Sequence, residues 1–325
     1  MKNKQAIQMN LTRAGLALVF SLLCFVAASA QLDRSFVATT GTDNESCGAQ
    51  TSPCRDFNAA LGKTNAGGAV VALDSGIYAL TNINITKSVT LAAAPGVHAD
   101  LYNTDNNNRI TVNATNSDTV ILRNLYLSGK TGGTNAYGIG VYRVGNLQVG
   151  NCVIDRFSEG IGSGGMQSTS DFFIKDTIVK NNLGSGMTVS TSAGLVRAVI
   201  DHCQFVNNGT GGVGDGISVT QRGRVSVRDT VATSNAGAGF LVVGGDLSLD
   251  NCESSNNDYG VYAGSSLVSD QVIVGTAVVS NSLVTNNKSY GFRQFGSGVF
   301  NSLGNNNVRR NNVNTTGTIN VVSGT

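Results

Sequence analysis

Histidine and clustered basic residues are scarce in this 325-residue sequence, in which His98 and His202 are the only histidines. A zinc site draws on several His or Cys ligands, and a catalytic triad needs a histidine beside its nucleophile, so two isolated histidines favour neither. No stretch contains five or more basic residues, which argues against nucleic acid and acidic membrane surfaces as partners. We therefore expect no metal, no cofactor and no nucleic-acid partner.

Tryptophan is absent, proline occurs twice, and charged residues make up only 13% of the chain, whereas glycine occurs 41 times. This composition is typical of short strands joined by many turns rather than of helices. Three of the 22 basic residues lie in the first 30 positions, which leaves 19 basic against 20 acidic residues and a formal charge of −1. No segment has the composition of an interdomain linker, and we expect a monomer.

Residues 1–30 have the pattern of a signal peptide. Lys2, Lys4 and Arg13 precede the apolar run 14–27, and the small residues 28–30 supply a cleavage site that ends at Ala30. A membrane anchor is the alternative, but the apolar run is short for a bilayer span and no stop-transfer pattern follows. We expect cleavage near Ala30, a mature chain without a membrane span, and a secreted or periplasmic location.

A repeated unit organises residues 120–310, and its clearest copy is LSLDNCESSNNDYGV at 247–261. Each copy has alternating apolar residues, a polar turn residue, an Asn-rich corner, a glycine and a second apolar run. Asn and Asp suit the turn because they tolerate the left-handed conformation. At intervals of 22 to 30 residues, the turn residues are Asn124, Asn151, Asp176, His202, Asp229, Asn251, Asn281 and Asn305.

The residues before each turn form columns when the copies are aligned. In the seven copies up to Asn281, positions two and four before the turn are apolar, as in Leu249 and Leu247, whereas the position between them is mixed. The position directly before the turn alternates in charge over Lys175, Asp201, Arg228 and Asp250, and we expect this column to be exposed. Period-two strands repeated at this interval predict an all-β right-handed parallel β-helix of roughly ten coils over residues 67–325.

Residues 31–66 are expected to form an N-terminal cap, because the end of a coil stack must be covered. Phe57, Ala60 and Leu61 have helical spacing and predict a short helix in the cap. In an oxidising compartment Cys47 and Cys54 favour a disulfide over a metal site. Three further cysteines follow the turn residue two coils apart, at about 9.6 Å, which is too far for a disulfide. We expect buried free thiols at Cys152, Cys203 and Cys252.

Five segments carry a family resemblance: PCRDFNAAL, GGAVVALDSGIY, ITKSVTLAA, IDHCQFVNNG and LDNCESSNND. The sequence resembles secreted bacterial right-handed β-helix repeat proteins of the pectate-lyase-like superfamily over nearly all of its mature length. This resemblance implies the fold and little about the activity, since the scaffold hosts lyases, hydrolases, epimerases and adhesins. It also implies that a polysaccharide would bind the outer face of the strands that follow the glycine.

The outer face of these strands is expected to hold five of the eight tyrosines. Aromatic rings stack on sugar rings and polar neighbours orient them, so the face is a candidate carbohydrate groove. The alternative is that an exposed strand column collects tyrosine through β propensity alone. The candidate residues are Tyr137, Tyr142, Tyr259, Tyr262, Tyr290 and Arg293.

Glu159 and Asp215 are the candidate catalytic residues, because two coils place their backbones about 9.6 Å apart. This value lies near the carboxyl separation of inverting glycosidases. The alternative is two unrelated surface acids. Neither the polygalacturonase-type motifs nor a calcium-binding carboxylate cluster is evident, and His202 fits a structural role within VIDHC.

We therefore favour a secreted, non-catalytic β-helix protein that binds extracellular polysaccharide or acts at the cell surface. The alternative is a polysaccharide lyase or glycoside hydrolase of the same fold.

Overall fold

The computed structural model describes residues 31–78, 81–130, 136–210 and 212–323. The predicted signal peptide, residues 1–30, lies outside the described residues. Within the described ranges no helix is both long and apolar enough to cross a membrane.

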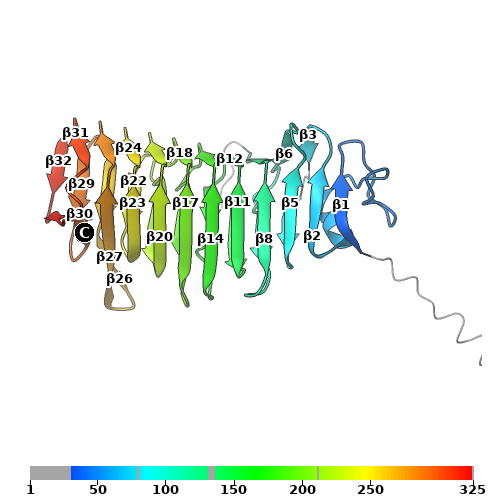
Figure 1. Ribbon diagram of the computed structural model, residues 1–325, viewed down its shortest axis with the longest axis horizontal. Helices are drawn as coiled ribbons and strands as arrows, with labels where there is room; N and C mark the ends of the chain where they lie inside the picture. The colour runs from blue at the N-terminus through cyan, green and yellow to red at the C-terminus, as the bar shows by residue number, and fades with distance from the viewer. Residues whose placement is uncertain (1–30, 79–80, 131–135, 211, 324–325) are drawn as a thin grey trace, which may run out of the picture. The chain divides into compact units, whose positions relative to one another are not determined.

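Three parallel sheets run along the stack of coils (Figure 1). Each coil from β2 to β32 contributes one strand to each sheet, whereas β1 and β33 at the two ends belong to the first sheet alone. Sheet A contains the strands that precede the polar turn, sheet B those that follow it, and sheet C those at the glycine corner. The right-handed parallel β-helix predicted from the sequence is confirmed.

Sheet A consists of β1 (Leu32–Val37), β2 (Thr64–Ala72), β5 (Val89–Ala93), β8 (Thr119–Arg123), β11 (Asn146–Gly150), β14 (Ser170–Lys175), β17 (Val196–Asp201), β20 (Gly223–Arg228), β23 (Gly245–Asp250), β27 (Gln271–Ser280), β30 (Val299–Ser302) and β33 (Asn320–Val321), with β26 (Ser265–Val268) antiparallel to β27. Sheet B consists of β3 (Gly76–Tyr78), β6 (Ala99–Tyr102), β9 (Leu125–Ser128), β12 (Val153–Asp155), β15 (Ile178–Lys180), β18 (Gln204–Val206), β21 (Val231–Thr233), β24 (Glu253–Ser255), β28 (Leu283–Thr285) and β31 (Asn307–Arg309). Sheet C consists of β4 (Ile83–Ile85), β7 (Ile110–Asn113), β10 (Tyr137–Arg143), β13 (Glu159–Gly162), β16 (Met187–Ser190), β19 (Ile217–Gln221), β22 (Ala238–Val242), β25 (Tyr259–Ala263), β29 (Tyr290–Gln294) and β32 (Val313–Thr316).

The aliphatic columns of sheet A form one wall of the core. Leu247 and Leu249 are each 1% exposed, and the intervening Ser248 faces solvent. A parallel stack places each of these residues above its counterpart in the preceding coil, so neighbouring coils cover each other's apolar side chains. The core is therefore a continuous apolar column inside the three sheets.

The polar turn between sheets A and B is left-handed, as the sequence pattern predicts. Seven of the eight predicted turn residues have φ between 50° and 57°. Asn305 is the exception, because in its coil Gly304 takes the positive φ of 80°. Asn305 nevertheless remains in the column, where its Nδ2 donates to Oδ1 of Asn281 over 2.8 Å. A glycine one position earlier makes the same bend without strain.

A buried ladder of asparagines lines the corner between sheets B and C. Its side chains bond from one coil to the next, and the glycines at the start of six sheet C strands, from β13 to β29, pack against it. A Cβ on Gly186 would lie 2.9 Å from Nδ2 of Asn208, so only glycine fits beside the ladder. The ladder consists of Asn182, Asn208, Asn235, Asn257, Asn287 and Asn311.

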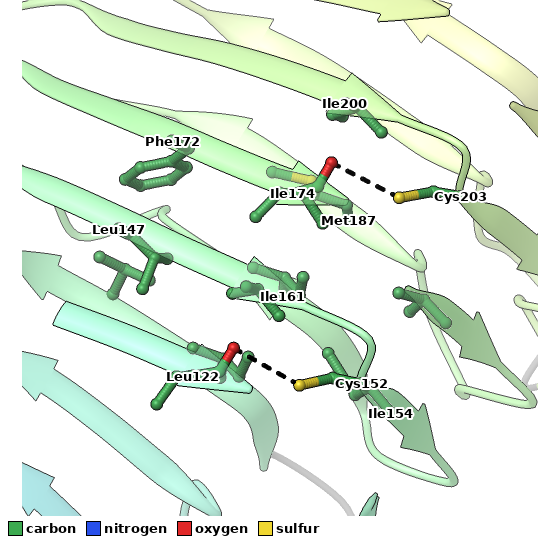
Figure 2. Close-up of a cluster of buried hydrophobic side chains, with 14 of the residues drawn as sticks. Leu122, Leu147, Cys152, Ile154, Ile161, Phe172, Ile174, Met187, Ile200 and Cys203 are labelled. Atoms are coloured by element: carbon green, nitrogen blue, oxygen red, sulfur yellow. Dashed lines mark hydrogen bonds between the residues drawn. The ribbon is translucent and has the colours of Figure 1, made fainter. Parts of the chain in front are cut away.

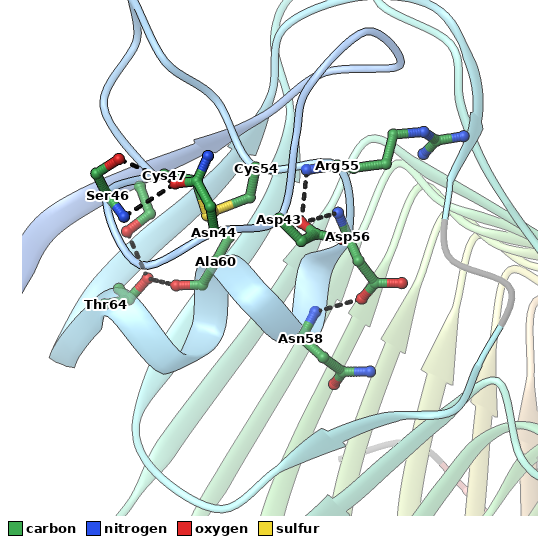
Figure 3. The surroundings of a disulfide bond; sticks show 11 residues. Asp43, Asn44, Ser46, Cys47, Cys54, Arg55, Asp56, Asn58, Ala60 and Thr64 are labelled. Atoms are coloured by element: carbon green, nitrogen blue, oxygen red, sulfur yellow. Dashed lines mark hydrogen bonds between the residues drawn. A yellow bond between two sulfur atoms is a disulfide. The ribbon is translucent and has the colours of Figure 1, made fainter.

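Helix α2 (Phe57–Lys63) precedes β2, and its Phe57, Ala60 and Leu61 are buried in the hydrophobic core. Asp56 caps the helix by accepting a hydrogen bond from the Asn58 N–H over 2.6 Å. A disulfide joins Cys47 to Cys54 beside the helix (Figure 3). β1 pairs with β2 in parallel, so residues 31–66, for which a cap is predicted, also supply the first strand of sheet A.

The other three cysteines, Cys152, Cys203 and Cys252, are buried free thiols. Each thiol faces a carbonyl of the preceding coil, as Figure 2 shows for two of them: Cys152 Sγ lies 3.7 Å from Leu122 O, and Cys203 Sγ lies 3.6 Å from Ile174 O. Burial raises the pKa of each thiol from 9.0 to about 11. They pack as small apolar side chains with a weak hydrogen bond.

Candidate functional site

The residue that precedes the glycine in each coil forms one column along the outer face of sheet C. β10 aligns Tyr137 with Glu159, and β22, β25 and β29 align Ala238 with Tyr259 and Tyr290. The structure thus places the candidate tyrosines and the candidate carboxylates on the same face. It does not bring them all into contact, because they occupy different rungs.

The residues Tyr259, Tyr262, Tyr290, Arg293 and Phe295 form what we call the tyrosine–arginine cluster. Tyr259 and Tyr290 stack with ring centroids 5.9 Å apart and an interplanar angle of 6°. Tyr262 meets Tyr259 edge-on at 5.7 Å. The guanidinium carbon of Arg293 lies 4.8 to 5.3 Å from the centroids of all four rings.

Arg293 forms no ion pair in the part of the chain that the structure describes. The rings supply cation–π contacts in place of a carboxylate, which leaves the guanidinium donors available to a ligand. Phe295 is 54% exposed and is missing from the sequence-based set. It directly follows β29, two residues after the outward-facing Arg293, and this spacing is the signal that could have identified it.

Tyr137 and Tyr142 form a second, separate group with Asn108. The Tyr137 N–H donates to Asn108 Oδ1 over 3.0 Å, and Asn108 Nδ2 donates to the Tyr142 hydroxyl over 3.3 Å. Burial, followed by the neighbouring Glu159, raises the pKa of Tyr137. Five rungs, or about 24 Å, separate this group from Tyr259. The sequence had no signal for Asn108, which lies in a coil without the regular turn pattern.

Glu159 and Asp215 lie between these two aromatic groups, with Ser185 on the intervening rung. The Asp215 N–H donates to Ser185 Oγ over 3.1 Å, and Asp215 Oδ1 accepts from the Ala238 N–H over 2.8 Å. Burial raises the pKa of Asp215 from 3.8 to about 6, despite the hydrogen bonds that favour its charged form. Burial also raises the pKa of Glu159, partly offset by a hydrogen bond from Thr188. A carboxyl group whose pKa lies nearer neutrality can donate or accept a proton.

Asp201 is buried, with a side chain only 4% exposed, so its predicted exposure is wrong. It accepts two hydrogen bonds from Arg228, at 2.9 and 3.1 Å, and His202 Nδ1 lies 2.7 Å from its Oδ1. These partners cover the carboxylate and, with Arg228 as the main cause, lower its pKa to about 2.

Asp201, His202 and Asp229 also bring one ligand atom each within 4.8 Å of one another. Because Asp201 already accepts from both Arg228 and His202, its lone pairs are engaged within the protein. The VIDHC segment therefore forms a structural ion-pair network at the turn between sheets A and B, on a different side of the coil from the candidate face.

Two solved structures resemble this chain along most of its length. The crystal structure of pectate lyase Pel9A matches with a TM-score of 0.57 and 17% identity, over 91% of this chain and 74% of that one. The crystal structure of an alginate lyase from Paenibacillus sp. str. FPU-7 matches with a TM-score of 0.62 and 16% identity, over 81% of this chain and 96% of that one. The chain has the pectate-lyase-like β-helix fold.

No protein-family model and no curated protein sequence matches this β-helix. At these identities the structural likeness concerns the fold, and the chemistry must be argued from the residues. Among the described residues, the second group of three potential metal ligands is Asp43 with the disulfide-bonded Cys47 and Cys54, so neither group consists of carboxylates alone. The outer face of sheet C offers stacking rings, one guanidinium and two half-buried carboxyls whose pKa is raised by burial.

Proposed function

We propose that this β-helix is a secreted protein that binds an extracellular polysaccharide along the outer face of sheet C. The observation that carries the proposal is the tyrosine–arginine cluster, in which four aromatic rings surround a guanidinium that has no acidic partner among the described residues. Aromatic faces stack on the C–H face of a sugar, and a guanidinium donates to its hydroxyl or carboxylate oxygens.

The extracellular location is supported by two independent features of the chain. Residues 1–30 have the charge and hydropathy pattern of a signal peptide. The Cys47–Cys54 disulfide is the kind of bond that persists in oxidising compartments. Export is tested by the mass of the protein recovered outside the cytoplasm, which should correspond to a chain that starts near Gln31.

Binding is tested with immobilised acidic and neutral polysaccharides, in a comparison of the native protein with variants of the cluster. Tyr259→Ala and Tyr262→Ala should each weaken binding about tenfold, because each removes a stacking surface. Tyr259→Phe keeps the ring and should bind like the native protein. Unchanged binding by both alanine variants would exclude the cluster as the binding site.

The carboxyl pair supports a second candidate function, a polysaccharide lyase or glycoside hydrolase. Asp215 has a pKa raised to about 6, which suits a general acid or base, and Glu159 lies two rungs away in the same column. The binding function predicts that no new reducing ends or unsaturated products appear with any polysaccharide that the protein binds. Products that disappear in both Glu159→Gln and Asp215→Asn would establish the enzymatic function instead.

A further inference from the structure

A hollow in the surface of sheet A lies where the charged column before the turn is interrupted. β8, β11 and β14, which run side by side in Figure 1, place Gly150 between Arg123 and Lys175 in register. A Cβ built on Gly150 would meet no atom within 4 Å, so the missing side chain leaves open space. The resulting cavity has a volume of about 340 Å³ and is lined by both cations.

The walls of this hollow combine an aromatic ring with polar groups. Phe173 is 55% exposed and lines the hollow beside Gln148 and Asp176. An aromatic side chain on an outer strand face provides a flat apolar platform that water does not solvate well. Lys175 lies 3.6 Å from Asp201, but Asp201 is already held by Arg228, so the ammonium can turn toward a ligand.

A second hollow of about 350 Å³ adjoins the first at the polar turn. Asn124 and Asn151 line both hollows, and Nδ2 of Asn151 donates to Oδ1 of Asn124 over 3.0 Å. The far side of the second hollow contains Tyr126 and His98, whose ring centroids lie 5.1 Å apart. We call the two hollows together the corner groove, since they follow the bend from sheet A to sheet B.

We infer that the corner groove binds an acidic oligosaccharide built of uronic-acid residues. Arg123 and Lys175 supply positive charge for one sugar carboxylate, and Phe173 supplies a platform for the same ring. Tyr126 and His98 offer a second aromatic surface for the adjoining sugar. The combined volume lies within the usual range of ligand pockets, roughly 300–1,000 Å³.

The aromatic walls separate a sugar acid from a simple anion. A phosphate or sulfate ion has no ring face to stack on the exposed Phe173, whereas a sugar ring does. The Asp176 carboxylate only accepts hydrogen bonds, so it pairs with sugar hydroxyl groups. The corner groove shares no residue with the sheet C face, so binding at the groove does not depend on binding at that face.

The test uses a linear tetramer of galacturonic acid as the probe and its fully methyl-esterified form as a neutral control. Calorimetric titrations are made on Tyr259→Ala/Tyr262→Ala protein, so that the sheet C face contributes little. We expect the acid to bind and the ester to bind at least about tenfold more weakly, with an affinity for the acid that falls as salt is added.

Gly150→Thr places a side chain in the corner groove and should weaken binding of the acid about tenfold. Phe173→Ser removes the aromatic platform and should have a similar effect. The matched control is Gly164→Thr, because a Cβ at Gly164 also meets nothing within 4 Å. It should leave the affinity unchanged. Circular dichroism verifies the fold of each variant.

Equal affinities of Gly150→Thr and its parent for the acid would overturn the inference, as would equal affinities of the parent for acid and ester. Loss of all binding to the acid in the Tyr259→Ala/Tyr262→Ala parent, when the native protein binds it, would also overturn the inference and would support the sheet C face instead. Failure of the native protein to bind the acid would overturn it outright.

Discussion

Asn208 and Asn235 are joined twice across neighbouring coils. Both the backbone N–H and the Nδ2 of Asn208 donate to Oδ1 of Asn235, each over 3.0 Å. Asn235 repeats the arrangement with Asn257, and both asparagines are buried. One amide side chain therefore satisfies polar groups of two coils at a corner that water does not reach.

Asn235→Ala should destabilise the protein by about 1–3 kcal/mol, because it leaves buried donors of Asn208 without an acceptor. The control is Asn207→Gly, which removes an exposed ladder bond and keeps the left-handed turn accessible. Urea unfolding followed by circular dichroism should show a lower midpoint for the first variant and little change for the second. Equal shifts would mean that the buried ladder is no more important than the exposed one.

Asp215→Asn should stabilise the protein at about pH 8 and have no effect at about pH 3.5. The folded-state pKa of Asp215 is raised to about 6, so ionisation opposes folding as the pH rises from 3.8 through 6. The amide oxygen of Asn can still accept from the Ala238 N–H. The test is the unfolding midpoint of the variant and of the native protein between about pH 3.5 and pH 8. A variant that is no more stable than the native protein at about pH 8 would contradict the raised pKa of Asp215.

Asp201 should make the native protein sensitive to acid. Its folded-state pKa is lowered from 3.8 to about 2 by Arg228 and His202. Its ion pairs therefore contribute stability above pH 3.8 that is lost as the pH falls toward 2. Asp201→Asn should lower the unfolding midpoint at neutral pH and flatten its decline in acid. Parallel pH profiles for the variant and the native protein would show that the network does not contribute.

The free thiols should react with a thiol reagent only after unfolding. Cys152, Cys203 and Cys252 are buried, and burial raises the pKa of each to about 11, so little thiolate exists at neutral pH. Ellman's reagent should detect no thiol in native protein that starts at Gln31, and three per chain in urea. Rapid reaction of a native thiol would place that cysteine at the surface.

The sequence predicted the columns because a parallel stack converts an interval of about 25 residues into direct contact. The burial of Leu249 and the left-handed conformation of Asn251 could be predicted from the residue pattern within a single repeat. The alternation of Lys175, Asp201 and Arg228 likewise indicated their register, which β14, β17 and β20 confirm.

Contacts between different columns depended on side-chain direction and on the loops, which no repeat specifies. The fourth ring around Arg293 is Phe295, which follows the end of β29, and Asn108 reaches Tyr142 from an irregular coil. Asp201 is buried because His202, from the neighbouring column, covers it together with Arg228 of its own column.

The sequence by itself thus determined the stack, its core and its turns, since these follow from one pattern of apolar and polar residues repeated every 22 to 30 residues, and the right hand follows from the general rule for parallel crossovers. Only the tertiary structure decided which outward residues meet and where the surface is hollow. Gly150 shows the reason: a missing side chain becomes a cavity only when the neighbouring coils leave it unfilled.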